Sequence, residues 1–120
     1  MSSHEKLVNA LKVFNKHIDT TGLYDGGNDH WFAINESDDR LLLAADNTPL
    51  ANRVQYQVHY YLPSEENYIA IKRRIRNGIF RAGFSYPTVD MLVEEETKLR
   101  HIIFEFEIAE DTGYLEESEE

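Results

Sequence analysis

Two histidines, His59 and His101, are the side chains of this sequence that are best placed to act together. Each falls on the polar side of an alternating segment, residues 53–62 and residues 98–108, so both would project from one wet face of a sheet. Neighbouring imidazoles can hold a metal ion. However, the histidines of the chain match no zinc motif and no His-Glu-x-x-His sequence. The sequence therefore favours two exposed histidines, with a ligand site as the alternative.

The residues used in nucleophilic catalysis lack their usual surroundings. The chain has no cysteine, no Gly-x-Ser-x-Gly sequence and no glycine loop that would cradle a phosphate. The adjacent acids Glu94, Glu95 and Glu96 are typical of a solvated turn, whereas a catalytic carboxyl group needs a raised pKa in a cleft. The sequence therefore predicts that the protein is not an enzyme and uses no cofactor and no metal.

The chain contains one basic cluster. Residues 72–76 include one lysine and three arginines, and Arg81 follows on the same predicted helix. A solvated helix face paired with local acids is one interpretation of this cluster. A contact with a partner protein and a phosphate-binding surface are the other two.

Two apolar residues favour the contact with a partner protein. Ile69 and Phe80 lie off the apolar stripe of the predicted helix, near Arg73 and Arg76, and such residue types are enriched in protein interfaces. We therefore predict an inter-subunit interface on this helix. Its residues are Ile69, Lys72, Arg73, Arg76 and Phe80. The alternative is that Ile69 and Phe80 widen a core stripe that the first helix covers.

The charge of the chain argues against a tightly held nucleic acid. The formal net charge is −10, and six of the last eleven residues are acidic while none is basic. Such a protein repels a phosphate backbone. No apolar run approaches the roughly 18 residues that a membrane span needs, so we expect a soluble protein without membrane contact.

An alternating strand is the element expected to position these residues. Every second side chain within residues 53–62 is apolar, which predicts one buried face. Pro63 ends the strand, and Ser64 offers an N-cap for a helix over residues 65–82 that Gly83 would end. The apolar residues of the strand are Val54, Tyr56, Val58, Tyr60 and Leu62. Those of the helix are Tyr68, Ile71, Ile75, Ile79 and Ala82.

The N-terminal segment predicts another helix. Ser2 and Glu5 have the spacing of a capping box, and apolar residues then recur at helical spacing. These features indicate an amphipathic helix over residues 3–20, with Gly22 as its stop. Glycine and asparagine predict a turn at residues 25–28.

The segment before the alternating strand predicts a hairpin. Residues 30–34 form a short aromatic strand candidate. Residues 41–45 form an apolar run that fits a buried strand, with a helical turn as the alternative. Residues 35–40 are polar and predict a turn between the two strands, and residues 46–49 predict a second turn.

The remaining residues complete a single domain. We predict a strand over residues 88–93, an acidic turn at residues 94–97 and a strand over residues 98–108. Residues 110–120 are expected to form an acidic, disordered tail, with an ordered docking arm as the alternative. Residues 1–109 would then form one α+β domain. Its two layers would be an antiparallel sheet of four or five strands and two helices packed on one face.

Three consecutive segments resemble a known family. Residues 53–62, the Ser-Glu-Glu-Asn-Tyr sequence at 64–68 with its helix, and the Arg-Ala-Gly-Phe sequence at 81–84 resemble the middle of phage tail terminator proteins. These are also called tail completion or tail-to-head joining proteins. Residues 96–108 are similar to the closing strand of that family. The resemblance covers roughly residues 50–109 of the chain.

The resemblance implies a small α+β subunit that forms a ring, typically a hexamer. Such a ring caps the finished tail tube, stops its polymerisation and offers a docking surface to the head connector, while DNA passes through without being held. It implies three kinds of partner: further copies of the chain, the major tail tube protein and the head connector protein. The implied location is the head-proximal end of the tail in the virion, and the host cytoplasm during assembly.

Other functions are also compatible with the sequence. A head-closure or connector protein of the same particle is the first. A small α+β ligand-binding domain that uses His59 and His101 is the second, and a nucleic-acid regulator that uses the basic helix is the third. Residues 41–52 and the Glu-rich tail depart from the pattern of the tail terminator family.

Overall fold

The strand predicted to organise the chain lies at the centre of a five-stranded sheet. A computed structural model describes residues 2–15, 17–20 and 30–117. The turn predicted at residues 25–28 and the end of the predicted tail, residues 118–120, lie outside the described residues. The elements in chain order are α1 (Ser3–Lys12), β1 (Ile18–Asp19), β2 (Trp31–Ala45), β3 (Thr48–Pro63), α2 (Ile69–Arg81), β4 (Thr88–Glu94), β5 (Leu99–Asp111) and α3 (Tyr114–Glu117).

The strand order of the sheet is β1-β2-β3-β5-β4. All neighbours pair antiparallel except β1, which runs parallel to β2 beside Phe32 and Ala33. The predicted α+β fold is therefore confirmed, with a mixed sheet in place of a purely antiparallel one. The two residues of β1 are too few to show the alternation by which a strand is predicted.

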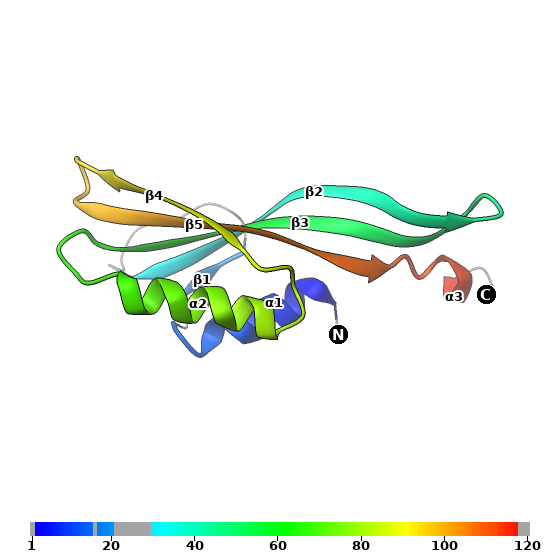
Figure 1. Cartoon of the computed structure of the whole chain (residues 1–120), viewed down its shortest axis with the longest axis horizontal. Coiled ribbons are helices and arrows are strands. Elements are labelled where there is room, and N and C mark those ends of the chain that lie inside the picture. The colour runs from blue at the N-terminus through cyan, green and yellow to red at the C-terminus, as the bar shows by residue number, and fades with distance from the viewer. Residues whose placement is uncertain (1, 16, 21–29, 118–120) are drawn as a thin grey trace.

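The core lies between one face of the sheet and the two longer helices, which Figure 1 shows on the same side of the sheet. The predicted apolar side chains of β3 are buried, and four of the five pair with apolar residues of β5. The pairs are Val54 with Ile108, Tyr56 with Phe106, Val58 with Phe104 and Tyr60 with Ile102. The helices add four fully buried residues to the same cluster: Leu7, Leu11, Ile75 and Ile79. Burying each such side chain stabilises the fold by about 1.5–3 kcal/mol.

Helix α1 ends at Lys12, so the helix predicted over residues 3–20 is too long. Asn15 explains the end of the helix. Its side-chain amide donates to the backbone carbonyl of His30 at 3.0 Å, and its side-chain oxygen accepts from the backbone N–H of His17 at 2.8 Å. These bonds draw the chain out of the helical path and towards β2.

Two apolar residues that were assigned to this helix still pack against the core from outside it. Phe14 follows the end of α1, and Ile18 belongs to β1. The ring of Phe14 lies against α2 at Gly78, where a Cβ atom would be 3.1 Å from Phe14 Cε2. The absence of a side chain at residue 78 therefore lets the segment after α1 approach α2 closely.

Strand β2 is continuous from Trp31 to Ala45, so the polar turn predicted at residues 35–40 is wrong. These residues stay extended because they pair with β3, and a register shift between Glu36 and Asp38 absorbs one extra residue. Local polarity indicated a turn, but the hydrogen-bonded pairing with a distant strand decides the conformation.

The hairpin turn connects β2 directly to β3 and is tighter than predicted. It is formed by Asp46 and Asn47, whose φ angles of 52° and 62° match a type I′ turn. Thr48 and Pro49, which were predicted to be part of the turn, begin β3 instead.

The apolar run over residues 41–45 is a strand, but the prediction that it is buried is wrong. Leu41, Leu42 and Leu43 are 59%, 50% and 56% exposed. We call residues 41–51, which surround the hairpin turn, the distal hairpin. In Figure 1 it projects beyond the end of the helix layer, which is why its leucines are not covered by α1 or α2.

Helix α2 begins four residues later than predicted, at Ile69. Ser64 does not cap it, because Ser64 lies five residues before the helix. Its backbone N–H donates to the Lys98 carbonyl at 2.9 Å and holds this residue at the end of β3. The side-chain oxygen of Asn67 accepts from the backbone N–H of Ile69 at 3.0 Å instead. The predicted end is confirmed, since Gly83 follows the helix with a φ of 109°.

Strands β4 and β5 form the predicted C-terminal hairpin, but the prediction of a disordered tail from residue 110 is wrong for residues 110–117. β5 continues to Asp111, and the short helix α3 follows. Thr112 fastens this segment to β3: its backbone N–H donates to the Leu50 carbonyl at 3.1 Å, and its hydroxyl donates to the Pro49 carbonyl at 2.8 Å.

The anchoring of α1 to β3 provides a test of the core. The hydroxyl oxygens of Ser3 and Tyr56 lie 2.6 Å apart, and both side chains are buried. Tyr56→Phe should lower the free energy of unfolding by about 1–3 kcal/mol, because the Ser3 hydroxyl loses its buried partner. Urea unfolding followed by circular dichroism measures this loss. In the double variant with Ser3→Ala, the loss should be smaller than the sum of the two single losses, and an additive result would contradict this bond.

Candidate functional site

The outward side of α2 carries a line of predicted interface residues. Ile69, Arg73, Arg76 and Phe80 follow one another at offsets of four, three and four residues, so they lie along one side of the helix. We call these four residues the α2 stripe. The buried residues of α2 point away from it into the core. The structure thus brings together four of the five residues that were predicted to form an interface.

Both ends of the α2 stripe are apolar and open to solvent. Ile69 is 58% exposed and Phe80 is 55% exposed. The alternative that these residues widen a core stripe under the first helix is therefore wrong. A contact with another molecule would remove these two side chains from water, and this burial would stabilise the contact.

Lys72, the fifth predicted residue, lies on the flank of the stripe. Its ammonium nitrogen is 5.5 Å from the centroid of the Tyr68 ring, and the guanidinium carbon of Arg100 is 4.2 Å from the same centroid. Tyr68 packs against the core, so its contact with the Lys72 ammonium group keeps that side chain on the flank of α2. Lys72 therefore adds positive charge to the surface without being part of its outer line.

Arg76 is the ordered cation of the stripe. Its Nε donates to the Pro87 carbonyl at 2.7 Å, and its guanidinium carbon lies 4.4 Å from the centroid of the Tyr86 ring. The Tyr86 ring in turn meets Phe80 edge to face at 5.7 Å. These contacts fix the C-terminal end of the stripe and add an exposed tyrosine to it. Sequence reasoning missed Tyr86, because its position depends on the bond between Arg76 and a carbonyl eleven residues away.

The other arginines of the cluster are exposed. Within the described ranges, no ion pair joins Arg73, Arg74 or Arg81 to an acid. The interpretation of a helix face neutralised by local acids therefore finds no support among these residues. The positive charge is available to a partner, and Arg73 lies between the two apolar ends.

The two histidines singled out in the sequence meet on the opposite face of the sheet. Nδ1 of His59 lies 2.5 Å from Nε2 of His101, so one ring donates a hydrogen bond to the other. Tyr61 stacks on His101 with ring centroids 4.2 Å apart, and on Trp31 at 3.8 Å. The favoured interpretation of two exposed histidines is wrong, since the His101 side chain is only 12% exposed.

The surroundings of this pair keep both imidazoles neutral. Burial lowers the pKa of His59. Burial, followed by the neighbouring His59, lowers the pKa of His101 to about 4, against a smaller opposing effect of Glu94, whose Oε1 lies 3.8 Å from Nδ1 of His101. Among the described residues, no group of three or more side chains is arranged to hold a metal ion. The pair acts here as part of the packed aromatic row on this face.

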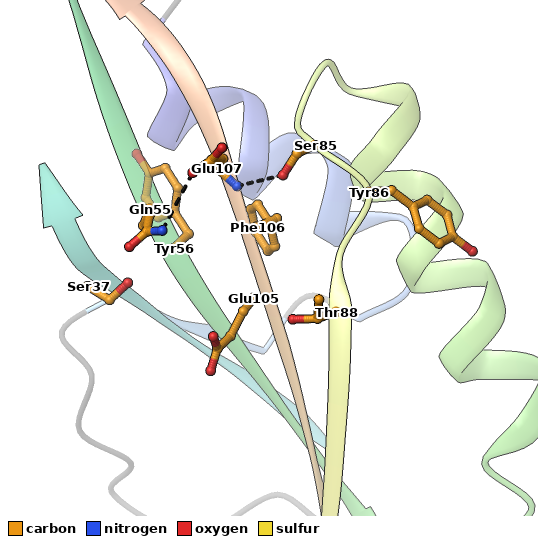
Figure 2. A pocket seen from close by; sticks show the side chains of 9 residues that line it. All are labelled: Ser37, Gln55, Tyr56, Ser85, Tyr86, Thr88, Glu105, Phe106 and Glu107. Atoms are coloured by element: carbon orange, nitrogen blue, oxygen red, sulfur yellow. Dashed lines mark hydrogen bonds between the residues drawn. The ribbon is translucent and has the colours of Figure 1, made fainter. Parts of the chain in front are cut away.

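A polar hollow of about 220 Å³ lies beside β5, and its lining side chains are drawn in Figure 2. Glu107 and Glu105 project into it from β5. Ser85 borders it from the segment before β4, and Thr88 borders it from the start of β4. The Glu107 backbone N–H donates to the Ser85 hydroxyl at 2.9 Å, and the Gln55 amide lies 3.5 Å from a Glu107 oxygen. Glu105 likewise accepts from the Gln57 amide at 3.1 Å. Both acids are thus engaged in cross-strand bonds, and these bonds stabilise the sheet.

Comparison of the chain with models of known protein families and with curated proteins finds no match. In the part of the chain that the structure describes, no helix combines the length and the apolar character needed to cross a membrane.

The histidine pair makes the stability of the fold depend on pH. The unfolded chain binds a proton on residue 101 near pH 6.5, whereas the folded chain does so only near pH 4. The free energy of unfolding should therefore rise between about pH 4 and 6.5, with this histidine adding a slope of up to about 1.4 kcal/mol per pH unit. His101→Gln should remove that increment from urea unfolding curves. The exposed His17→Gln is the control, and equal slopes in both variants would contradict this assignment.

Proposed function

We propose that the protein is a structural subunit of a phage tail, a tail terminator whose copies form a ring that caps the tail tube. The ring stops tube polymerisation and offers the docking surface for the head connector. The observation that carries this proposal is the α2 stripe, a surface with apolar ends and a basic centre that the described part of the chain leaves exposed.

The composition of the stripe supports a contact between protein subunits. Burying Ile69 and Phe80 would contribute about 1.5–3 kcal/mol each. Arg73 lies between them and would attract acidic side chains of the neighbouring subunit. Arg76 is already held in place by Pro87 and Tyr86. An ordered arginine loses less conformational freedom on binding. The stripe thus combines apolar anchors with a preorganised charge, as interface hot spots do.

The charge and the shape of the subunit support assembly into a ring. The chain carries a formal net charge of −10, so a basic stripe on one copy is attracted to acidic surfaces on another. The molecule is elongated, with extents of 54 × 26 × 23 Å. A contact between two different surfaces of identical subunits generates a closed ring when the rotation between copies closes. An acidic ring lets DNA pass without trapping it, because like charges repel.

The terminator role within this proposal rests on the resemblance of residues 50–109. In the structure this region contains most of β3 and β5 together with α2 and β4, and it supplies most of the buried core. The proposed partners are further copies, the major tail tube protein and the head connector, and the proposed location is the head-proximal end of the tail.

Charge reversal on α2 tests the assembly surface. Arg73→Glu should weaken self-association at least about 30-fold, equivalent to about 2 kcal/mol, because it places a carboxylate at the centre of the contact. Arg74→Glu is the matched control: it changes the neighbouring exposed residue, which lies off the stripe, and should leave association unchanged. Light scattering of each variant, alone and with tail tube protein, gives the mass. Equal association of both variants, or a native protein that stays monomeric and does not bind tubes, would contradict the proposal.

Particles assembled without the protein distinguish the terminator role from a head-side joint. A missing terminator leaves tube polymerisation unchecked, so electron microscopy should show abnormally long tails. Free tails of normal length beside heads that leak DNA would instead identify a head-closure or connector protein and overturn the terminator role.

A further inference from the structure

We propose that the α2 stripe of one copy binds a groove of the next copy, between α3 and the distal hairpin. This inference rests on the proposed assembly and identifies the second surface of the contact. The groove occupies about 550 Å³. Its lining combines apolar side chains of β2, β3 and α3 with acids at the end of β5 and on α3. The lining residues that carry the inference are Leu43, Leu50, Leu115, Glu110, Asp111 and Glu116.

Hydrogen bonds within the chain fix the shape of the groove. Thr112 donates two hydrogen bonds to β3, at Leu50 and Pro49, and fastens the start of α3 beside the distal hairpin. Gly113 then adopts a φ of 73° with its N–H bonded to the Asp111 side chain at 2.7 Å, which turns the chain into α3. These bonds set the position of α3, so the groove has ordered walls before any partner arrives.

The walls of the groove are apolar and exposed. Leu43 is 56% exposed and Leu115 is 57% exposed. An engineered cavity of about 150 Å³ holds a benzene molecule, so a groove of this size accommodates the Phe80 ring together with a second side chain. The groove therefore matches the apolar ends of the α2 stripe in chemistry and in size.

The charge of the groove selects the same occupant. Its lining contains three acids and neither lysine nor arginine. Glu110 accepts from the backbone N–H of Ser3 at 2.9 Å, and Asp111 accepts from Gly113, so one oxygen of each is engaged within the chain. Glu116 is exposed on α3. The densest basic cluster of the whole sequence is on α2, which makes a second copy of this chain the occupant with complementary charge.

The two surfaces are too far apart to meet within one molecule. Figure 1 shows α3 at one end of the long axis, whereas α2 lies under the opposite half and the centre of the sheet. The stripe and the groove therefore join different copies head to tail. Each added copy presents one free stripe and one free groove, and a ring satisfies both on every copy.

A charge swap tests this contact. Arg73→Glu and Glu116→Arg should each weaken self-association at least about 30-fold, and a chain with both changes should regain it to within about threefold. Mixing the two single variants should also restore assembly, because each then meets the opposite charge. Sedimentation of each sample measures the assembled fraction. Glu95→Arg, an exposed acid in the turn between β4 and β5, is the control and should assemble normally.

The outcomes separate this inference from the proposed function. If Arg73→Glu blocks assembly while Glu116→Arg assembles like the native chain, the groove is not the counterpart and the function stands. A native protein that never assembles, alone or on tail tubes, overturns both. A mass that corresponds to two copies keeps the contact but overturns the ring.

Cysteine pairs provide a test that does not depend on charge. The chain contains no cysteine, so Arg73→Cys combined with Glu116→Cys introduces the sole thiols. Mild oxidation should then join successive copies, since a disulfide forms only between nearby side chains, and a non-reducing gel should show a covalent ladder. Arg74→Cys with Glu116→Cys is the matched control. Ladders of equal yield from both pairs, or from neither, would overturn the proposal.

Discussion

The difference in length between the strands and the helices determines this structure. β3 has 16 residues and α2 has 13, which correspond to about 53 Å of strand and about 20 Å of helix. Helices α1 and α2 therefore cover only part of the sheet, in a molecule whose longest extent is 54 Å. The covered part is the folded core. The uncovered part is the distal hairpin, which keeps its strand pairing but leaves its leucines exposed.

This mismatch explains how one small domain presents the two different surfaces that we propose for assembly. Packing against the sheet buries one side of α2. The other side, which carries Ile69, Arg73 and Phe80, faces solvent. The uncovered end of the sheet exposes Leu43 and holds α3 beside it through Thr112. The first surface is basic and the second is acidic. Their separation along the long axis favours association of one copy with the next over closure within a single chain.

Periodic packing is the part of the fold that the sequence predicts well. The alternation of β3, the stripe of α2 and the face of β5 follow from the repeat of strands and helices, because each element buries one side. The end of α1 and the continuity of β2 could not be predicted in this way. The chain turns away after α1 where Asn15 bonds to His30, and residues 35–40 stay extended through pairing with β3. Both features depend on partners distant in the sequence.

The same distinction applies to the candidate site. The spacing of Ile69, Arg73, Arg76 and Phe80 was sufficient to place them together on one side of a helix. Tyr86 joined them only through the bond between Arg76 and Pro87. The groove was invisible in the sequence, because its apolar walls come from three separate segments and its acids had been assigned to a disordered tail.

Electron microscopy of the purified protein bound to tail tubes tests the central claim most directly. A closed ring with a central hole at one end of each tube is the result that this structure predicts, with α2 of every copy against α3 of its neighbour. Tubes that end without added density, or copies that attach singly along the tube wall, would contradict it.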